Sequence, residues 1–185
     1  MDMSNRVILS DRLRQVSITE AYIDIMYQEF TSEITTYMTP QPARHRSETE
    51  AFVSGAMQTN AAGTNLQLVI LDRQTGEFLG CSGLHEIQTR TPELGIWLKK
   101  TAHNHGYGLE AIGAIIQWAN ENVSFDYLKY PVDRRNAPSR RIPATYGGIA
   151  EDAYKAVNGS GFELDLIEFR IKPSQAAGKV RSSDD

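Results

Sequence analysis

The clearest pattern of hydrophobic and polar positions lies in ELGIWLKKTAHNHGYGLEAIGAIIQW, residues 93–118. Its first six residues alternate between an apolar row, Leu94, Ile96 and Leu98, and an opposite face, which predicts a β-strand. Glu93 lies on that opposite face. The later apolar residues recur at helical spacing, which predicts a helix that packs on a sheet. The segment therefore predicts a strand, a short glycine loop and a helix.

The same two periods predict the other elements of the chain. Helices are expected after two capping-box patterns, which begin at Ser17 and Ser47. Strands are expected over residues 12–16, 66–71, 78–84, 125–132, 150–157 and 162–171, with turns at 72–76 and 158–161 that make two hairpins. The order of elements predicts a mixed α/β chain.

Two prolines interrupt these patterns. Pro131 falls inside a predicted strand, and because it has no N–H for the ladder we expect it at an edge or at a break in pairing. Pro143 falls inside the last predicted helix, which it should kink or shorten. Asn136 and Ser139 stand where they can cap that helix, which has Pro138 in its first turn.

Composition narrows the class of protein. The chain has 185 residues of which 41% are hydrophobic, enough for one core, so we expect one domain over residues 1–172. The residues from 173 to 185 are small and polar and are expected to form a disordered tail. The net charge is −4 with both signs interspersed, which does not suggest a nucleic-acid-binding face.

The cellular location follows from what the sequence contains. We find no apolar run long enough to span a bilayer, and the first residues lack the apolar core of a secretion signal, so no membrane partner is expected. The single cysteine, Cys81, cannot form an internal disulfide and is interpreted as a buried, inert side chain. These features predict a cytoplasmic protein.

The loop before the central helix contains His105, Gly106, Tyr107 and Gly108. Free N–H groups at a helix N-terminus and two glycines that allow close approach favour an anionic group such as a pyrophosphate, although two glycines can also mark only a tight turn. The loop is neither a Walker loop nor a complete dinucleotide fingerprint. His103 and His105 lack the further ligands that zinc needs, so no metal site is expected.

This loop, HNHGYG, resembles the Q/R-x-x-G-x-G/A signature of the GNAT superfamily of acyl-CoA-dependent N-acyltransferases, with His103 in place of Gln or Arg. ELGIWL resembles the E-x-G-Y-W-L strand of the RimJ/RimL-like branch, which includes the ribosomal-protein N-terminal acetyltransferases. NAPSRRIPATYGG resembles that family's N-x-x-S-x-x-V-x-x-K-x-G-F, but Thr145 replaces the lysine and Gly148 replaces the phenylalanine. The resemblance covers roughly residues 8–172.

The resemblance implies a GNAT fold: a mostly antiparallel twisted sheet of about seven strands, splayed between the fourth and fifth, with about four flanking helices. It implies acetyl-CoA as co-substrate and no metal. The residues that it assigns to acetyl-CoA binding are Ile96, Trp97, Leu98, His103, His105, Gly106, Tyr107, Gly108, Asn136 and Arg141.

The chemistry that the resemblance implies is transfer of an acetyl group to an amine. Glu93 is the candidate base, acting directly or through one water, and otherwise it is a charged residue on an exposed face. Ser139 is the first candidate proton donor for the departing thiolate, and Tyr146 is the second. A backbone N–H near Ile96 is the candidate group that polarises the thioester carbonyl. His85 is expected at the rim.

Two classes of function stay open. The first is an N-acetyltransferase whose acceptor is a protein N-terminal α-amine or, alternatively, a small-molecule amine. The second is a non-catalytic CoA-binding or interaction module on the same fold. A homodimer is compatible with both classes.

Overall fold

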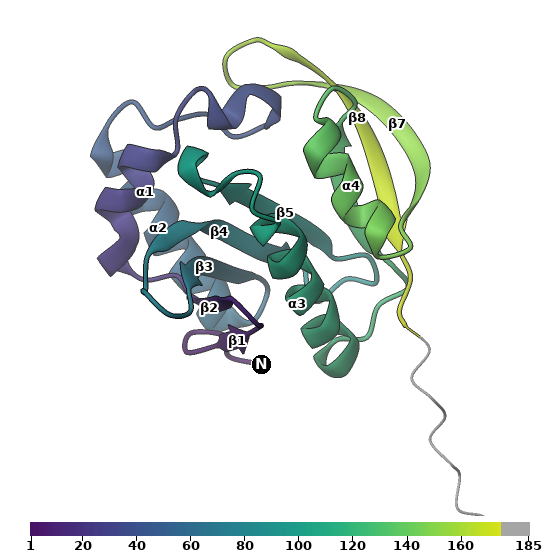
Figure 1. The fold of residues 1–185 in the computed structure, drawn as a ribbon, viewed down its shortest axis with the longest axis horizontal. Helices are drawn as coiled ribbons and strands as arrows, with labels where there is room; N and C mark the ends of the chain where they lie inside the picture. Colours follow the sequence, from purple (N-terminus) through teal and green to yellow (C-terminus); the bar gives the residue numbers. More distant parts are fainter. Residues whose placement is uncertain (175–185) are drawn as a thin grey trace, which may run out of the picture.

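The computed structural model describes residues 1–174, which form an eight-stranded sheet with helices on both faces (Figure 1). The sheet order is β1-β2-β3-β4-β5-β6-β8-β7. The strands are β1 (Val7–Leu9), β2 (Leu13–Ser17), β3 (Leu66–Asp72), β4 (Phe78–His85), β5 (Glu93–Leu98), β6 (Leu128–Asp133), β7 (Ile149–Val157) and β8 (Glu163–Ile171). Only β5 and β6 run parallel among the described strands. The expected mixed fold with a mostly antiparallel sheet is confirmed, and β1 is an additional strand.

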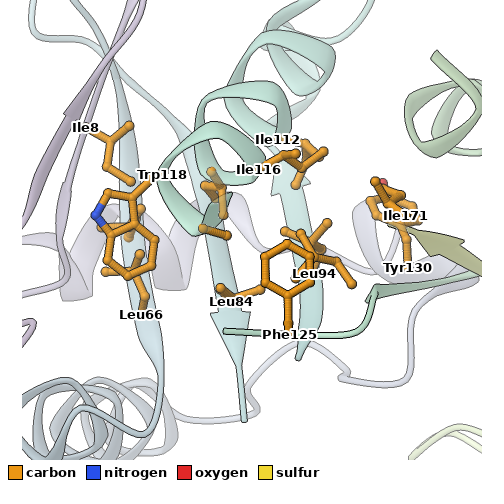
Figure 2. Close-up of a cluster of buried hydrophobic side chains, with 14 of the residues drawn as sticks. Ile8, Leu66, Leu84, Leu94, Ile112, Ile116, Trp118, Phe125, Tyr130 and Ile171 are labelled. Carbon is orange, nitrogen blue, oxygen red and sulfur yellow. The ribbon is translucent and has the colours of Figure 1, made fainter. Parts of the chain in front are cut away.

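Four α-helices cover the sheet, and adjacent residues of β3 show how its two faces are divided. The helices are α1 (Ile23–Glu29), α2 (Arg46–Ala62), α3 (Tyr107–Asn122) and α4 (Ala137–Thr145). Leu68 packs in the core under α3, whereas Val69, which points to the opposite face, packs with residues of α1 and α2. Figure 2 shows Ile112 and Ile116 of α3 over Leu94 of β5. The apolar row predicted for β5 therefore does pack against the central helix.

Both capping-box predictions are wrong because the serine side chains have other roles or positions. Ser17 ends β2, where its Oγ donates to the Met3 carbonyl (2.5 Å) and accepts from the Arg6 N–H (2.8 Å). The chain then enters α1 through a 3-10 turn, Glu20–Tyr22. The second helix already begins at Arg46, one residue before the predicted serine cap.

The sheet splays between β5 and β6, at the position that the resemblance implied. These strands pair only at Glu93 and Lys129. The Lys129 N–H donates to the Pro92 carbonyl (2.8 Å), on the side of β6 that faces β5. Strand residues two positions apart direct their backbone nitrogens to the same side, so the nitrogen of Pro131, which carries no hydrogen, faces the gap between β5 and β6. The proline therefore costs the sheet no ladder hydrogen bond, and its expected place at a break in pairing is confirmed. The strand begins at Leu128 rather than at residue 125.

The last helix is short, as Pro143 predicted. Asn136 caps α4 by accepting the Ser139 N–H (3.2 Å), and the helix ends at Thr145, two residues after the proline. The carbonyl of Pro143 then accepts the Gly148 N–H (2.8 Å), which turns the chain into β7. The predicted tail lies outside the described residues from position 175 onward. Between residues 1 and 174, none of the helices combines the length and apolarity that crossing a membrane requires.

Candidate active site

The separation of β5 from β6 opens a cleft of about 1100 Å³. Strands β5 and β6, the start of α3 and α4 line one part of it, and α1, α2 and residues 34–43 line the other. The Lys99 N–H donates to the Leu79 carbonyl of β4 (2.8 Å), so by alternation the N–H of Ile96 faces away from β4, into the gap. The backbone of β5 therefore offers hydrogen-bonding groups to a ligand in the cleft.

Side chains tie the segment before α2 to the turn between β7 and β8, both at the top of Figure 1. The Asn158 amide donates to the Met38 carbonyl (3.4 Å). The Arg135 guanidinium lies against the rings of Tyr37 (5.4 Å) and Phe162 (4.8 Å). Because Tyr37 and Met38 line the cleft, these contacts fix the part of its wall that lies opposite α3.

The start of α3 has backbone features that a predicted anion cradle requires. Gly106 caps the helix in the left-handed conformation (φ 78°), and Asn104 also has a positive φ (65°). Within residues 1–174 no hydrogen bond is recorded for the backbone N–H groups of residues 104–108. A side chain at Gly108 would meet Ile142 at 3.3 Å, so glycine keeps this backbone accessible from the cleft. Free N–H groups at the positive end of a helix of 16 residues fit a phosphate.

The two histidines of this loop have structural contacts. The ring of His103 lies on the cleft wall and its Nε2 donates to the Leu98 carbonyl (2.9 Å), which joins the loop to the end of β5. His105 stacks on Tyr107 (5.6 Å between ring centroids) and does not line the cleft. The His103 N–H donates to the Lys100 carbonyl (3.2 Å) and His105 lies outside the cleft, so the free backbone N–H groups on the cleft wall are those of the residues around Gly106.

Arg12 is a residue of this region that the sequence analysis missed. Its guanidinium pairs with Glu110 of α3 (2.7 Å), donates to the His105 carbonyl (2.9 Å) and lies over the Tyr107 ring (4.8 Å). It thus anchors the glycine loop from β1 and β2, nearly a hundred positions earlier in sequence. No local pattern around residue 12 signals such a contact.

Glu93 lies at the point where β5 and β6 last pair, and it lines the cleft. Burial raises the pKa of its carboxyl above the usual range, the Lys129 ammonium 3.8 Å away opposes this, and the charges of Glu86 and Glu168 add to the rise. The same face of β5 presents Trp97, whose ring packs on Phe30 (4.8 Å). Glu93 therefore combines access to the cleft with a raised proton affinity.

The two candidate proton donors differ in position. Ser139 lines the cleft, and its Oγ forms a hydrogen bond with the Tyr130 hydroxyl (2.9 Å). Tyr146 does not line the cleft: its hydroxyl donates to the Leu109 carbonyl of α3 (2.7 Å) and its ring packs on Gly113. Of the two, the geometry brings only Ser139 to the cavity that holds Glu93.

The matching protein-family model is the acetyltransferase (GNAT) domain, over residues 12–149. The chain belongs to this family. As a GNAT acetyltransferase it moves an acetyl group from acetyl-CoA to an amine, and the cleft with its anion cradle fits that co-substrate.

Relatives of this GNAT domain agree in length and fold. The uncharacterized N-acetyltransferase p20 of Bacillus licheniformis is 22% identical over 173 residues, which cover 90% of this chain and 94% of that protein. The structure of RimL, a ribosomal L7/L12 α-N-protein acetyltransferase in complex with coenzyme A, matches with a TM-score of 0.81 at 15% identity, over 90% and 98% of the chains. The microcin C7 self-immunity acetyltransferase MccE, in complex with acetyl-CoA and AMP, matches with a TM-score of 0.78 at 19% identity, over 88% and 93%. The expected RimJ/RimL-like resemblance is thereby confirmed at the level of the fold.

Most residues that the sequence assigned to the site of this GNAT domain share the cleft. Those on its wall are Glu93, Ile96, Trp97, Leu98, His103, Gly106, Tyr107, Gly108, Asn136, Ser139 and Arg141, whereas His105 and Tyr146 lie outside it. Cys81 also touches the cleft, but its burial raises the pKa of the thiol. In the described part of the chain, no cluster of three or more His, Cys, Asp or Glu side chains could hold a metal ion.

Proposed function

We propose that this protein acetylates a protein N-terminal α-amine by direct attack of the amine on acetyl-CoA in a ternary complex. The observation that carries the proposal is that the anion cradle at α3 and the Glu93 carboxylate lie on one continuous cleft. Two substrates that enter the same cleft can be bound together, so no acetylated enzyme intermediate is needed.

Glu93 is the proposed base. An α-ammonium group has an ordinary pKa of about 7.7–8.0, whereas a lysine side chain has one of about 10.4. A carboxylate can therefore remove the proton of an α-ammonium group at a smaller cost in free energy. The raised pKa of Glu93 brings its carboxyl closer to that of the α-amine, which strengthens it as a base. This match favours an α-amine over a lysine side chain as acceptor.

The remaining roles belong to the cleft wall between β5 and α4. Acetyl-CoA supplies the activated acetyl thioester. The N–H of Ile96, which faces the gap, donates to the carbonyl oxygen where negative charge develops. Ser139 donates to the sulfur as the carbon–sulfur bond breaks. Tyr146 is the weaker candidate for that role because its hydroxyl is already bonded to α3.

A small-molecule amine is the second candidate acceptor. Aromatic side chains of Phe30 and Trp97 and the side chain of Met26 stand on the wall of the cleft across from α3. Such a surface suits a compact amine with an apolar body. The structural neighbour MccE is in complex with acetyl-CoA and AMP, which supports a small-molecule amine as the alternative acceptor.

The test is release of free CoA from acetyl-CoA in the presence of short peptides with free N-termini, small amines and aminoglycosides. Wild type should release CoA with one acceptor class, and Glu93→Gln should lower kcat by roughly 100-fold with little change in the KM for acetyl-CoA. Glu151→Gln, an exposed carboxylate of β7 outside the cleft, is the matched control. Binding of CoA without turnover on any acceptor would instead favour a non-catalytic module.

Acetyl-CoA use and the single free cysteine fit a cytoplasmic location, which we include in the proposal. A homodimer is a further proposal that carries no weight in the chemistry, since every group named above comes from one chain.

A further inference from the structure

The hydroxyl group of Tyr130 is a buried polar group at this cleft for which the reaction scheme gives no role. Its side chain belongs to the core cluster under α3 and is 3% exposed (Figure 2). The hydroxyl reaches the cleft wall, where Ser139 Oγ, at 2.9 Å, is its one recorded partner within residues 1–174. Sequence alone gave no reason to join a strand residue to the first turn of the following helix.

The environment decides which of the two hydroxyls donates. If Ser139 donated to Tyr130, the phenolic hydrogen would have no protein acceptor within residues 1–174, which is costly for a side chain that is 3% exposed. If Tyr130 donates, both oxygens are satisfied, and the hydrogen of the partly exposed Ser139 is free to point into the cleft. Burial raises the pKa of Tyr130 to about 12, so the phenol keeps its proton at neutral pH and stays a donor.

The rest of Ser139 is already fixed. Its backbone N–H donates to Asn136 Oδ1 (3.2 Å), and Pro138 precedes it in the first turn of α4. With the backbone held by the cap and the oxygen held by Tyr130, the hydroxyl hydrogen remains available to a group in the cleft. A donor whose oxygen also accepts a hydrogen bond is polarised and becomes a better donor.

We propose that Tyr130 is a positioning residue that donates to Ser139 and thereby directs the Ser139 hydroxyl at the sulfur of the departing CoA. This inference rests on the proposed function. In the step, the amine nitrogen, having lost its proton to Glu93, bonds to the acetyl carbon, and the carbon–sulfur bond breaks with its electron pair on sulfur. Ser139 stabilises that thiolate by a hydrogen bond, and the thiolate then takes, through water, the second proton that the acylated nitrogen loses, which leaves the neutral amide and free CoA. No proton leaves Tyr130.

A double-mutant cycle tests this inference, using Tyr130→Phe, Ser139→Ala and the double variant. If Tyr130 acts through Ser139, Tyr130→Phe lowers kcat by roughly tenfold in the wild-type background, with the KM for acetyl-CoA nearly unchanged. In the Ser139→Ala background the same change has almost no further effect on kcat. Tyr127→Phe, a neighbouring tyrosine that does not line the cleft, is the control and should leave kcat unchanged.

The outcomes separate this inference from the proposed function. Equal losses from Tyr130→Phe in both backgrounds would mean that the hydroxyl acts through packing, and no loss in the wild-type background would mean that it has no role; either result overturns the inference alone. A wild-type protein that acetylates no amine, or a Ser139→Ala variant with unchanged kcat, would overturn the proposed mechanism itself. Thermal unfolding of each variant checks that lost activity is not lost folding.

Discussion

At the scale of single residues, the charge of Lys129 sets how strong a base Glu93 can be. The two groups lie 3.8 Å apart at the last pairing point of β5 and β6. Burial raises the pKa of Glu93 above its usual range, and the Lys129 ammonium opposes this rise by stabilising the carboxylate. The proton affinity of Glu93 therefore depends on two opposing effects, the burial of its carboxyl and the charge of Lys129.

Replacing Lys129 with methionine should shift the pH dependence of turnover. Because the cation lowers the pKa of Glu93, its removal raises that pKa, and the acid limb of the profile of kcat against pH moves to higher pH. The profile should be measured at saturating acceptor, so that it reports the bound complex. Lys155→Met, on the exposed face of β7, is the control; an unmoved limb in Lys129→Met would argue against Glu93 as the titrating base.

At the scale of elements, the loop between β5 and α3 depends on a backbone conformation that only glycine adopts readily. Gly106 has φ 78°, and the N–H groups that follow it form the proposed phosphate site. Gly76, in the hairpin between β3 and β4, has nearly the same φ (75°), with no atom within 4 Å of an added Cβ. The two glycines therefore share a backbone preference but differ in their distance from the cleft.

This pair gives a controlled prediction. Changing either glycine to alanine should destabilise the fold by about 1 kcal/mol, since both must hold a left-handed conformation. Only Gly106→Ala should also raise the KM for acetyl-CoA, by roughly five- to tenfold, because only there does the strain distort the cradle. Equal KM values in the two variants would contradict a phosphate site at this helix start.

At the scale of the whole molecule, Asp133 connects the end of β6 to the C-terminal hairpin. Its fully buried carboxylate accepts from the Arg135 guanidinium (2.6 and 2.8 Å) and from the Asp165 N–H (3.0 Å). The Arg135 contact lowers the pKa of Asp133 to about 2. Arg135 in turn packs between Tyr37 and Phe162, so one carboxylate supports the wall of the cleft.

The pH dependence of unfolding should show how much the Asp133 carboxylate contributes to stability. Its folded-state pKa is below the unfolded value, so its stabilisation, about 2 kcal/mol, is complete above pH 4 and is lost as the pH falls toward 2. Asp133→Asn should therefore unfold at lower urea concentration than wild type at pH 7, with a difference that shrinks toward pH 2. A constant difference across that range would show that packing, and not charge, is responsible.

Most strands, the central helix and the glycine loop could be predicted from local signals in the sequence, whereas the splayed sheet and the acetyl-CoA site were implied by the family resemblance. Each of these signals acts on the backbone close to it: the alternation of apolar residues predicts β5, and the glycines after it predict the loop before α3. The prolines predict a break in pairing at β6 and the short helix α4. What could not be predicted depends on contacts between segments, some of which lie far apart in the sequence. The three-residue β1 forms only against β2, the first capping serine serves that same pairing, and Arg12 and Tyr146 are placed by α3.

The central claim, acetyl transfer to an α-amine, is tested most directly with one peptide in two forms. Both contain an internal lysine, and one has a free N-terminus while the other is N-terminally blocked. Acetyl transfer to an α-amine predicts that only the free form of the peptide leads to release of CoA and that mass spectrometry places the acetyl group on the α-amine. The Glu93→Gln variant should lose both the CoA release and the acetylated product. Equal release with the blocked peptide, or no release from either despite bound acetyl-CoA, would contradict the central claim.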